Sequence, residues 1–310
     1  MKYRRLGSTG IKVSELSLGT NNFGTEVDQQ TSARIMKKAV DVGINMIDTA
    51  NVYAQGRSEE LIGKAIWDDR DELLIATKVG INRIQPHYGG LSRKHIMWQV
   101  RKSLERLQTD YIDFYCLHVY DLETPLEETL RTMDYLVKQG RVRYVACSNF
   151  TIAQLEEARE ICERLDLEKF VTVQPPYNLL LRGIEMDLLP YCQEKGLGVL
   201  TYSPLAGGLL TGKYKQGEPP PKGSRAALNR GFWEETKKQT DFSALARLLA
   251  IANDSKLPLR NLSLAWVMRK PTVTALIAGA SNPEQVEENY LALEAKVPED
   301  VLRMLDEAHS

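Results

Sequence analysis

The chain has 310 residues and nearly balanced charge, with 40 lysines and arginines against 41 aspartates and glutamates. This balance gives no electrostatic reason to bind nucleic acid or an anionic membrane, so a small neutral or weakly charged ligand fits better. A barrel built from strand and helix units needs about 250 residues as one piece. We therefore predict that residues 1–310 form a single domain.

The N-terminus and the cysteines favour the cytoplasm. MKYRRLGSTG lacks the apolar core of a signal peptide, and no run approaches the ~18 apolar residues of a membrane span. Cys116, Cys147, Cys162 and Cys192 show no CxxC spacing. We expect these thiols to be reduced and to pack as small apolar groups.

The first segment predicts a hairpin. YRRLGSTGIKV reads as two short strands on either side of Gly7 to Gly10. Such a hairpin can close one end of a barrel.

Eight strand-like runs follow, separated by segments with helical spacing. The runs begin near Ser14, Ile44, Leu73, Ile112, Arg143, Val171, Gly198 and Thr274. The segments between them, such as SARIMKKAVDVG and KHIMWQVRKSLERL, place apolar residues every three or four positions. Regular alternation of strand and helix indicates a parallel sheet, and eight units predict an α/β fold, the (β/α)8 TIM barrel.

Local signals predict where several helices begin. Thr124-Pro125-Leu126-Glu127 combines a capping threonine, a proline at the first helical position and a reciprocating glutamate, and Thr151 with Gln154 and Asn282-Pro283 with Gln285 repeat the pattern. EPPPKGSRAALNRGFW, residues 218–233, is too rich in proline and glycine for a strand or helix. We predict a long irregular insertion here, before the last units, that covers one end of the barrel and a ligand.

Polar side chains gather at the predicted carboxyl ends of the second to sixth strands. They are Asp48, Lys78, His118, Ser148, Asn149 and Gln174. Taken alone, Asp48 could cap a helix, Lys78 could be solvated and His118 could be a satisfied histidine below a turn. Together they favour an active site, because this rim is where barrel enzymes assemble theirs.

Asp48 requires a partner, because an isolated buried carboxylate loses several kcal/mol of hydration. Lys78 ends the next strand and can supply it. At ~4 Å and an effective dielectric of ~20, a charged Lys78 would attract a Tyr53 phenolate by about 4 kcal/mol, before desolvation offsets part of this. We predict that the pKa of Tyr53 falls towards neutrality and that Tyr53 donates a proton to a carbonyl oxygen, with His118 as a second hydrogen-bond donor.

These residues lie in motifs that resemble the aldo-keto reductase family. The matching stretches are GINMIDTANVY at Gly43 to Tyr53, ATK at Ala76 to Lys78, SLERLQTDYIDFYCLH at Ser103 to His118 and GRVRYVACSNF at Gly140 to Phe150. The resemblance covers essentially the whole chain. It implies that Asp48, Tyr53, Lys78 and His118 form a catalytic tetrad, with Tyr53 as the general acid.

The same resemblance implies an NADP(H) site. Ser148, Asn149 and Gln174 match residues that hold the carboxamide, Tyr202 the aromatic that stacks on the nicotinamide, and Thr20 and Asn21 a turn near the ribose. The pyrophosphate segment is matched by Ser203, Pro204, Leu205, Gly207, Leu209 and Lys213. An ordinary Gly-rich loop is the alternative for SPLAGGLLTGK. No GxGxxG follows a strand, so a Rossmann domain is not expected.

The adenosine end is matched by AGASNPEQVEEN. By resemblance, Ser281 and Gln285 contact the 2'-phosphate, Glu288 and Asn289 contact the adenine, and the helix start at Asn282-Pro283 adds free N–H groups. Gly279-Ala280 and Gln285 replace the Lys-Ser pair and arginine of many family members. This pattern, with Arg225 in PPPKGSRAALNRGF, resembles the branch of voltage-gated potassium channel β subunits. NADP(H) is the expected cofactor, with less fixed positive charge at its phosphate.

Three functions remain compatible with the sequence. The first is NADPH-dependent reduction of an aldehyde or ketone, and the second is a nicotinamide-sensing regulatory or binding protein. The resemblance implies asparagine in the channel-subunit branch where this chain has His118, which favours the first. The third is a Schiff-base lyase at Lys78, which Asp48 disfavours by keeping the lysine protonated.

No metal site is expected, because His87, His95, His118 and His309 offer no ligand pair at useful spacing. The expected partner is a small carbonyl compound of undetermined identity, and a homo-oligomer is possible. Loop residues placed above the rim could line its pocket or could simply pack: Asn22, Phe23, Tyr88, Tyr120 and Trp233.

Overall fold

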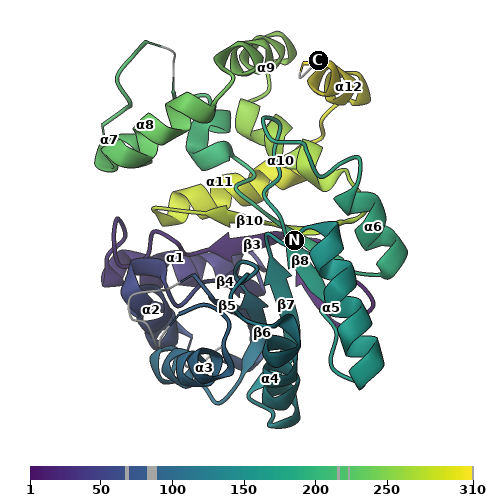
Figure 1. The fold of residues 1–310 in the computed structure, drawn as a ribbon. Helices are drawn as coiled ribbons and strands as arrows, with labels where there is room; N and C mark the ends of the chain where they lie inside the picture. The colour runs from purple at the N-terminus through teal and green to yellow at the C-terminus, as the bar shows by residue number, and fades with distance from the viewer. Residues whose placement is uncertain (67–69, 82–88, 215–216, 223, 309–310) are drawn as a thin grey trace.

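A closed barrel of parallel strands forms the centre of the molecule (Figure 1). The computed structural model describes residues 1–66, 70–81, 89–214, 217–222 and 224–308. Its barrel strands are β3 (Leu16–Gly19), β4 (Met46–Asp48), β5 (Leu74–Val79), β6 (Ile112–Leu117), β7 (Val142–Ser148), β8 (Thr172–Gln174), β9 (Gly198–Tyr202) and β10 (Val273–Gly279). They follow chain order around the barrel, and β10 closes it by pairing with β3. The eight predicted strands and the (β/α)8 architecture are confirmed.

Helices surround the strands and extend beyond one end of the barrel (Figure 1). Those that alternate with strands are α1 (Gln29–Asp41), α2 (Arg57–Ala65), α3 (Arg93–Leu107), α4 (Leu126–Lys138), α5 (Ile152–Leu165), α6 (Leu188–Lys195), α10 (Leu259–Met268) and α11 (Pro283–Glu294). Further helices are α7 (Arg225–Leu228), α8 (Arg230–Gln239), α9 (Phe242–Ser255) and α12 (Glu299–Glu307), with short 3-10 helices η1 (Tyr53–Gly56), η2 (Arg70–Glu72) and η3 (Ala206–Thr211). In the described part of the chain, none of these helices combines the length and apolar character that crossing a bilayer requires.

Alternation along the strands separates two apolar clusters. Ile47, Ile75 and Val79 pack outward against the helices, whereas Met46 and Ala76 face the barrel interior. The two-residue period therefore places Asp48 and Lys78 on the interior face, at the carboxyl ends of β4 and β5.

The predicted N-terminal hairpin is present and closes the barrel opposite those carboxyl ends. β1 (Tyr3–Arg5) pairs antiparallel with β2 (Lys12–Ser14). Leu6 and Val13 are fully buried among the interior residues. Gly198 permits this close approach, because a Cβ there would lie 2.5 Å from Leu6 Cδ1. The hairpin is thus an apolar plug.

The helix-start signals are confirmed only in part. Thr151 caps α5 with a reciprocal bond from Gln154, as predicted. Asn282 caps α11, but Gln285 accepts from Ser281 N, one residue earlier than expected. The Thr124 cap is wrong: α4 begins at Leu126, and the Thr124 hydroxyl donates instead to Asp121 Oδ2. Asp121 also accepts from Glu123 N, so this carboxylate holds Thr124 in a turn before the helix, and Pro125 takes the N-cap position.

The prediction of an irregular 218–233 insertion is also wrong in part. The proline-rich stretch ends before Ser224, which caps α7, and α8 follows. The good helix formers after Ser224 outweigh the composition of the stretch before it. The segment does reach the carboxyl end of the barrel, where Ser224, Arg225 and Leu228 line a cavity.

The four cysteines, all within the described residues, are buried and carry free thiols. This agrees with the expectation that they pack as small apolar groups.

The plug predicts a measurable loss of stability. Leu6→Ala should lower the free energy of unfolding by about 2–5 kcal/mol, because it leaves a cavity that the surrounding strands cannot fill. Urea denaturation followed by circular dichroism measures this, with the highly exposed Leu122 as Leu122→Ala control. Equal midpoints for Leu6→Ala and the native protein would contradict the assigned role of the hairpin.

Candidate active site

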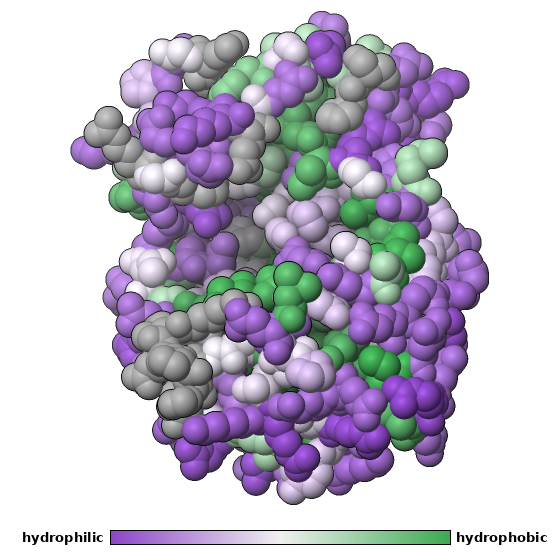
Figure 2. All heavy atoms as spheres, viewed as in Figure 1, coloured by the Kyte–Doolittle hydropathy of each residue, from purple (hydrophilic) through white to green (hydrophobic). Residues whose placement is uncertain are grey.

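A cavity of about 800 Å³ lies at the carboxyl ends of the barrel strands. Figure 2 shows this face of the molecule hollowed between the barrel and the segment that contains α7 and α8. Polar and charged side chains from many strand ends and following loops line it. Its size suits a ligand of cofactor dimensions.

Most residues predicted for the site line this one cavity. Among them are the four proposed catalytic residues Asp48, Tyr53, Lys78 and His118, together with Thr20, Asn21, Ser148, Asn149, Gln174, Tyr202, Ser203, Pro204, Leu205, Gly207, Lys213, Arg225, Gly279, Ser281, Gln285 and Asn289. Two predicted cofactor residues do not line it. Leu209 is buried in the apolar core, and Glu288 is an exposed residue paired with Arg260.

The predicted pair of Asp48 and Lys78 is a short buried ion pair. Lys78 Nζ donates to Asp48 Oδ2 at 2.6 Å and to the Thr49 carbonyl at 2.8 Å. The other carboxylate oxygen, Oδ1, accepts from Gln174 Nε2 at 2.9 Å. Burial alone would lower the pKa of Lys78, but the Asp48 carboxylate, together with Tyr53 and Cys116, outweighs this and raises it. Lys78 is therefore held as an ammonium ion.

Tyr53 is positioned directly above this pair. Lys78 Nζ lies 5.3 Å from the centroid of the Tyr53 ring. Tyr53 starts η1, and the next two residues, Ala54 and Gln55, have left-handed backbone angles with φ of 48° and 57°. Consecutive non-glycine residues in this region are strained and are typical of functional sites. The turn fixes where the phenol points.

The predicted fall in the pKa of Tyr53 is wrong. Burial raises this pKa, and the opposing attraction of Lys78 is too weak to reverse the shift because Asp48 adds a raising contribution of its own. The Asp48 carboxylate partly neutralises the ammonium, and the desolvation of the phenol exceeds the attraction that remains. At neutral pH the Tyr53 phenol is consequently protonated.

His118 lines the same part of the cavity as Tyr53 and Lys78. Its ring lies edge-on to Tyr53, with centroids 6.0 Å apart and planes at 80°. Burial, followed by the nearby charge of Lys78, lowers the pKa of His118 to about 3. His118 is therefore neutral at physiological pH, and one ring nitrogen carries a proton that it can donate.

A connected hydrogen-bond network extends from His118 to Tyr202. Asn149 Nδ2 donates to the His118 carbonyl at 3.1 Å, and the Tyr202 hydroxyl donates to Asn149 Oδ1 at 2.9 Å. Ser148 Oγ donates to the Gln174 carbonyl at 2.8 Å. These residues, all among the predicted site residues, hold one another in place at the carboxyl ends of the adjacent strands β6, β7, β8 and β9.

The loop after β9 exposes backbone at the cavity wall. Ser203, Ala206, Gly207 and Gly208 all have positive φ. Ala206 N and Gly208 N donate within this turn, to the Ser203 and Leu205 carbonyls, and turns with successive positive φ are a form that suits bound phosphate oxygens. Lys213 lies close to Gly208: a Cβ added at Gly208 would be 3.4 Å from the Lys213 Nζ. The loop therefore has a positive charge beside it.

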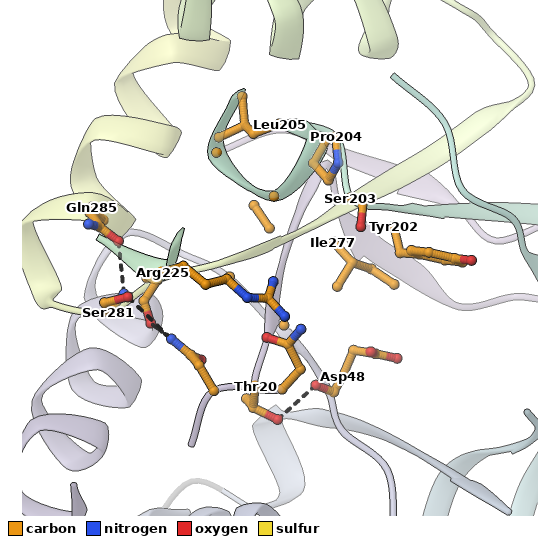
Figure 3. Close-up of a pocket in the computed structure, with 18 of the residues that line it drawn as sticks. Thr20, Asp48, Tyr202, Ser203, Pro204, Leu205, Arg225, Ile277, Ser281 and Gln285 are labelled. Atoms are coloured by element: carbon orange, nitrogen blue, oxygen red, sulfur yellow. Dashed lines mark hydrogen bonds between the residues drawn. The ribbon is translucent and has the colours of Figure 1, made fainter. Parts of the chain in front are cut away.

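The opposite end of the cavity is formed by the start of α11 and by side chains from other elements. Figure 3 shows Ser281 and Gln285 at this end, with Arg225 reaching across the cavity towards the Asp48 end. Asn22 joins this wall, donating from Nδ2 to the Ala280 carbonyl at 2.9 Å. Two charged residues here were not predicted from sequence, Glu26 and Arg260. Glu26 could have been found from its place in the loop after β3; Arg260 sits in a helix with no local signal.

Most of the residues proposed to line a substrate pocket do not line the cavity. Asn22 lines the cavity, but Phe23 is fully buried. Trp233, in α8, stacks on Tyr214, which precedes α7 in the chain. Tyr120 turns away, donating to Glu157. Tyr88 lies outside the described residues. The aromatic loop residues that can be described therefore pack, as the alternative interpretation held.

In the described ranges, no group of three or more His, Cys, Asp or Glu side chains is arranged to hold a metal ion.

The sequence is similar to known proteins along nearly its whole length. Residues 15–310 match the Aldo/keto reductase family. The chain is 38% identical to a probable voltage-gated potassium channel subunit beta of Oryza sativa subsp. japonica, over 95% of this chain and 92% of that protein. It is also 38% identical to the uncharacterized oxidoreductase YrpG of Bacillus subtilis, over 99% of this chain and 95% of that protein. A putative channel subunit beta of Schizosaccharomyces pombe is 38% identical, over 98% of this chain and 92% of that protein.

The neutrality of His118 can be tested by pH titration. Its folded-state pKa is below the unfolded value of 6.5, so the folded protein resists protonation as the pH falls through that value. Nitrogen-detected NMR of histidine-labelled protein, with His118→Asn to assign the signal, should show a neutral ring throughout pH 5 to 8 (about the range in which an ordinary histidine titrates). A titration midpoint near that of a free histidine would contradict the burial of His118 beside the Lys78 ammonium.

Proposed function

The chain belongs to the aldo/keto reductase family, and we propose that it reduces an aldehyde or ketone to an alcohol with NADPH as the hydride donor. The observation that carries this proposal is the convergence of the Asp48–Lys78 ion pair, Tyr53 and neutral His118 on one side of the cavity. The oxidoreductase among the relatives supports the reaction class.

The cavity offers what a dinucleotide needs along its length. Near the tetrad, Ser148, Asn149 and Gln174 can hold an amide and Tyr202 can stack on a ring. The loop of Ser203 to Gly208 can receive the pyrophosphate through its backbone, and the cations Lys213 and Arg225 line the same wall. When bound, the reduced nicotinamide supplies the hydride that the carbonyl carbon accepts.

The protein's own part in the reaction is to deliver a proton and manage charge. Because burial keeps Tyr53 protonated, its phenol is available to the carbonyl oxygen, which gains negative charge as the carbon is reduced. Proton donation leaves a tyrosinate that the Lys78 ammonium stabilises, so the ion pair acts most strongly where charge develops. Neutral His118 donates a hydrogen bond to the same oxygen and orients it.

A second function is favoured by the names of two relatives. They are described as channel β subunits, which supports a nicotinamide-nucleotide-binding regulatory protein as the alternative. The intact tetrad, including His118, favours turnover. Steady consumption of NADPH with a panel of carbonyl compounds would support the reductase, whereas tight nucleotide binding without turnover would support the alternative.

A Schiff-base lyase at Lys78 is disfavoured by the geometry. Attack on a carbonyl needs a neutral amine. Asp48 binds the ammonium at 2.6 Å and raises its pKa.

We further propose a cytoplasmic setting and a small carbonyl compound as the partner, with neither nucleic acid nor membrane involved. Buried free thiols and balanced charge support this proposal. A homo-oligomer is compatible with it.

Tyr53→Phe tests the proton donor. It should lower carbonyl reduction by about 10²- to 10⁴-fold, since a positioned general acid contributes on that scale. NADPH binding, followed by quenching of protein fluorescence, should persist. Tyr120→Phe is the matched control, because its hydroxyl bonds Glu157 away from the cavity. Native turnover by Tyr53→Phe would disprove the assignment.

Gln285→Glu tests where the 2'-phosphate lies. Gln285 Oε1 accepts from Ser281 N at 2.8 Å, and a glutamate keeps that acceptor, so the substitution changes charge at nearly constant shape. NADPH should lose affinity by about 10-fold or more while NADH changes little, because only the phosphate meets the new like charge. Equal losses for both nucleotides would place the phosphate elsewhere.

A further inference from the structure

The start of α11 supplies fewer free amide donors than its sequence suggested. Ser281 N donates to Gln285 Oε1, and Gln285 N donates to Asn282 Oδ1. Pro283 has no N–H at all. A phosphate dianion at this end of the cavity would therefore find the Ser281 and Gln285 amides already engaged, and positive charge from a side chain would strengthen its binding.

Arg260 is a charged side chain in position to provide it, whereas Arg225, which also lines the cavity, reaches towards the Asp48 end (Figure 3). Arg260 belongs to α10, which packs beside α11, and it lines the same cavity as Ser281, Gln285 and Asn289. Its Nη1 donates to Glu288 Oε2 at 2.5 Å, whereas its Nε–H is buried and has no hydrogen-bond partner among the residues that the structure describes. Its side chain is 24% exposed, so it is held in the wall rather than free in solvent.

We propose that Arg260 is a specificity-determining residue that binds the 2'-phosphate and that Glu288 is its counter-ion in the nucleotide-free protein. The inference rests on the proposed use of a nicotinamide nucleotide, and it assigns Glu288 a different role from the adenine contact expected from sequence. A guanidinium has five N–H donors in a planar fork, so it can keep one bond to Glu288 and turn others to phosphate oxygens.

The pair also explains how the cavity can accept a phosphate without leaving a charge alone. Without nucleotide, Glu288 neutralises Arg260 and avoids an uncompensated cation in the wall. With a 2'-phosphate present, the phosphate competes with Glu288 for the same guanidinium. A 2'-hydroxyl cannot compete in this way, so the pair distinguishes the two nucleotides.

Calorimetric titration of the full chain with NADP⁺ and with NAD⁺ tests the proposal without relying on turnover. Arg260→Gln should weaken NADP⁺ by about 10- to 100-fold, the scale of a charge-assisted contact, and change NAD⁺ by less than about twofold. Glu288→Gln should strengthen NADP⁺ several-fold, because it removes the competing carboxylate. If Glu288 instead contacted adenine, that variant would weaken both nucleotides.

Lys38→Gln is the matched control. Lys38, in α1, pairs with Glu287 of α11, the helix that also carries Glu288, but Lys38 does not line the cavity. Removing the positive charge of Lys38 therefore reports the effect of net charge alone. The proposal is overturned if Arg260→Gln weakens both nucleotides equally, leaves both unchanged, or acts no differently from Lys38→Gln. Normal discrimination by a native protein that reduces no carbonyl compound would refute the proposed reaction and leave this inference standing.

Discussion

The arrangement of the candidate active site depends on the buried contact between Lys78 and Asp48. Neither charge could remain at this depth alone, because each would lose its hydration without compensation. Their contact at 2.6 Å, supported by Gln174 and the Thr49 carbonyl, fixes an ammonium ion beneath Tyr53 and beside His118. That one cation helps to keep the histidine neutral and can stabilise a tyrosinate. Removing either partner would therefore alter the protonation of the whole group.

The sequence was sufficient to predict the ion pair and one helix start, because a short local pattern determines each of them. The two-residue period of β4 and β5 put Asp48 and Lys78 on the interior face, and the parallel pairing of those strands brought them into contact. Thr151 and Gln154 specify a helix start within a few residues, and the structure has it. The predicted cap at Thr124 is wrong because Asp121, a residue outside the pattern, holds Thr124 in the preceding turn and α4 begins one residue later.

Effects that balance opposing contributions, or that join distant segments, could not be read in the same way. The direction of the Tyr53 pKa shift depends on whether desolvation exceeds an attraction that Asp48 partly cancels, and only the burial of the finished fold decides it. Arg260 is an ordinary residue of an amphipathic helix until the packing of α10 beside α11 brings it to the cavity. Likewise, the composition of residues 218–233 concealed the capped helix that begins after Ser224.

The hairpin that fills the lower interior has a consequence for the recovery of the catalyst. Leu6 and Val13 form, with Met46, Phe114 and Leu200, an apolar layer beneath the ion pair. Tyr53, by contrast, lines the open cavity at the carboxyl ends of the strands. In the proposed reaction, the proton that Tyr53 gives up would be replaced from this cavity, so reloading of the acid would be tied to departure of the alcohol.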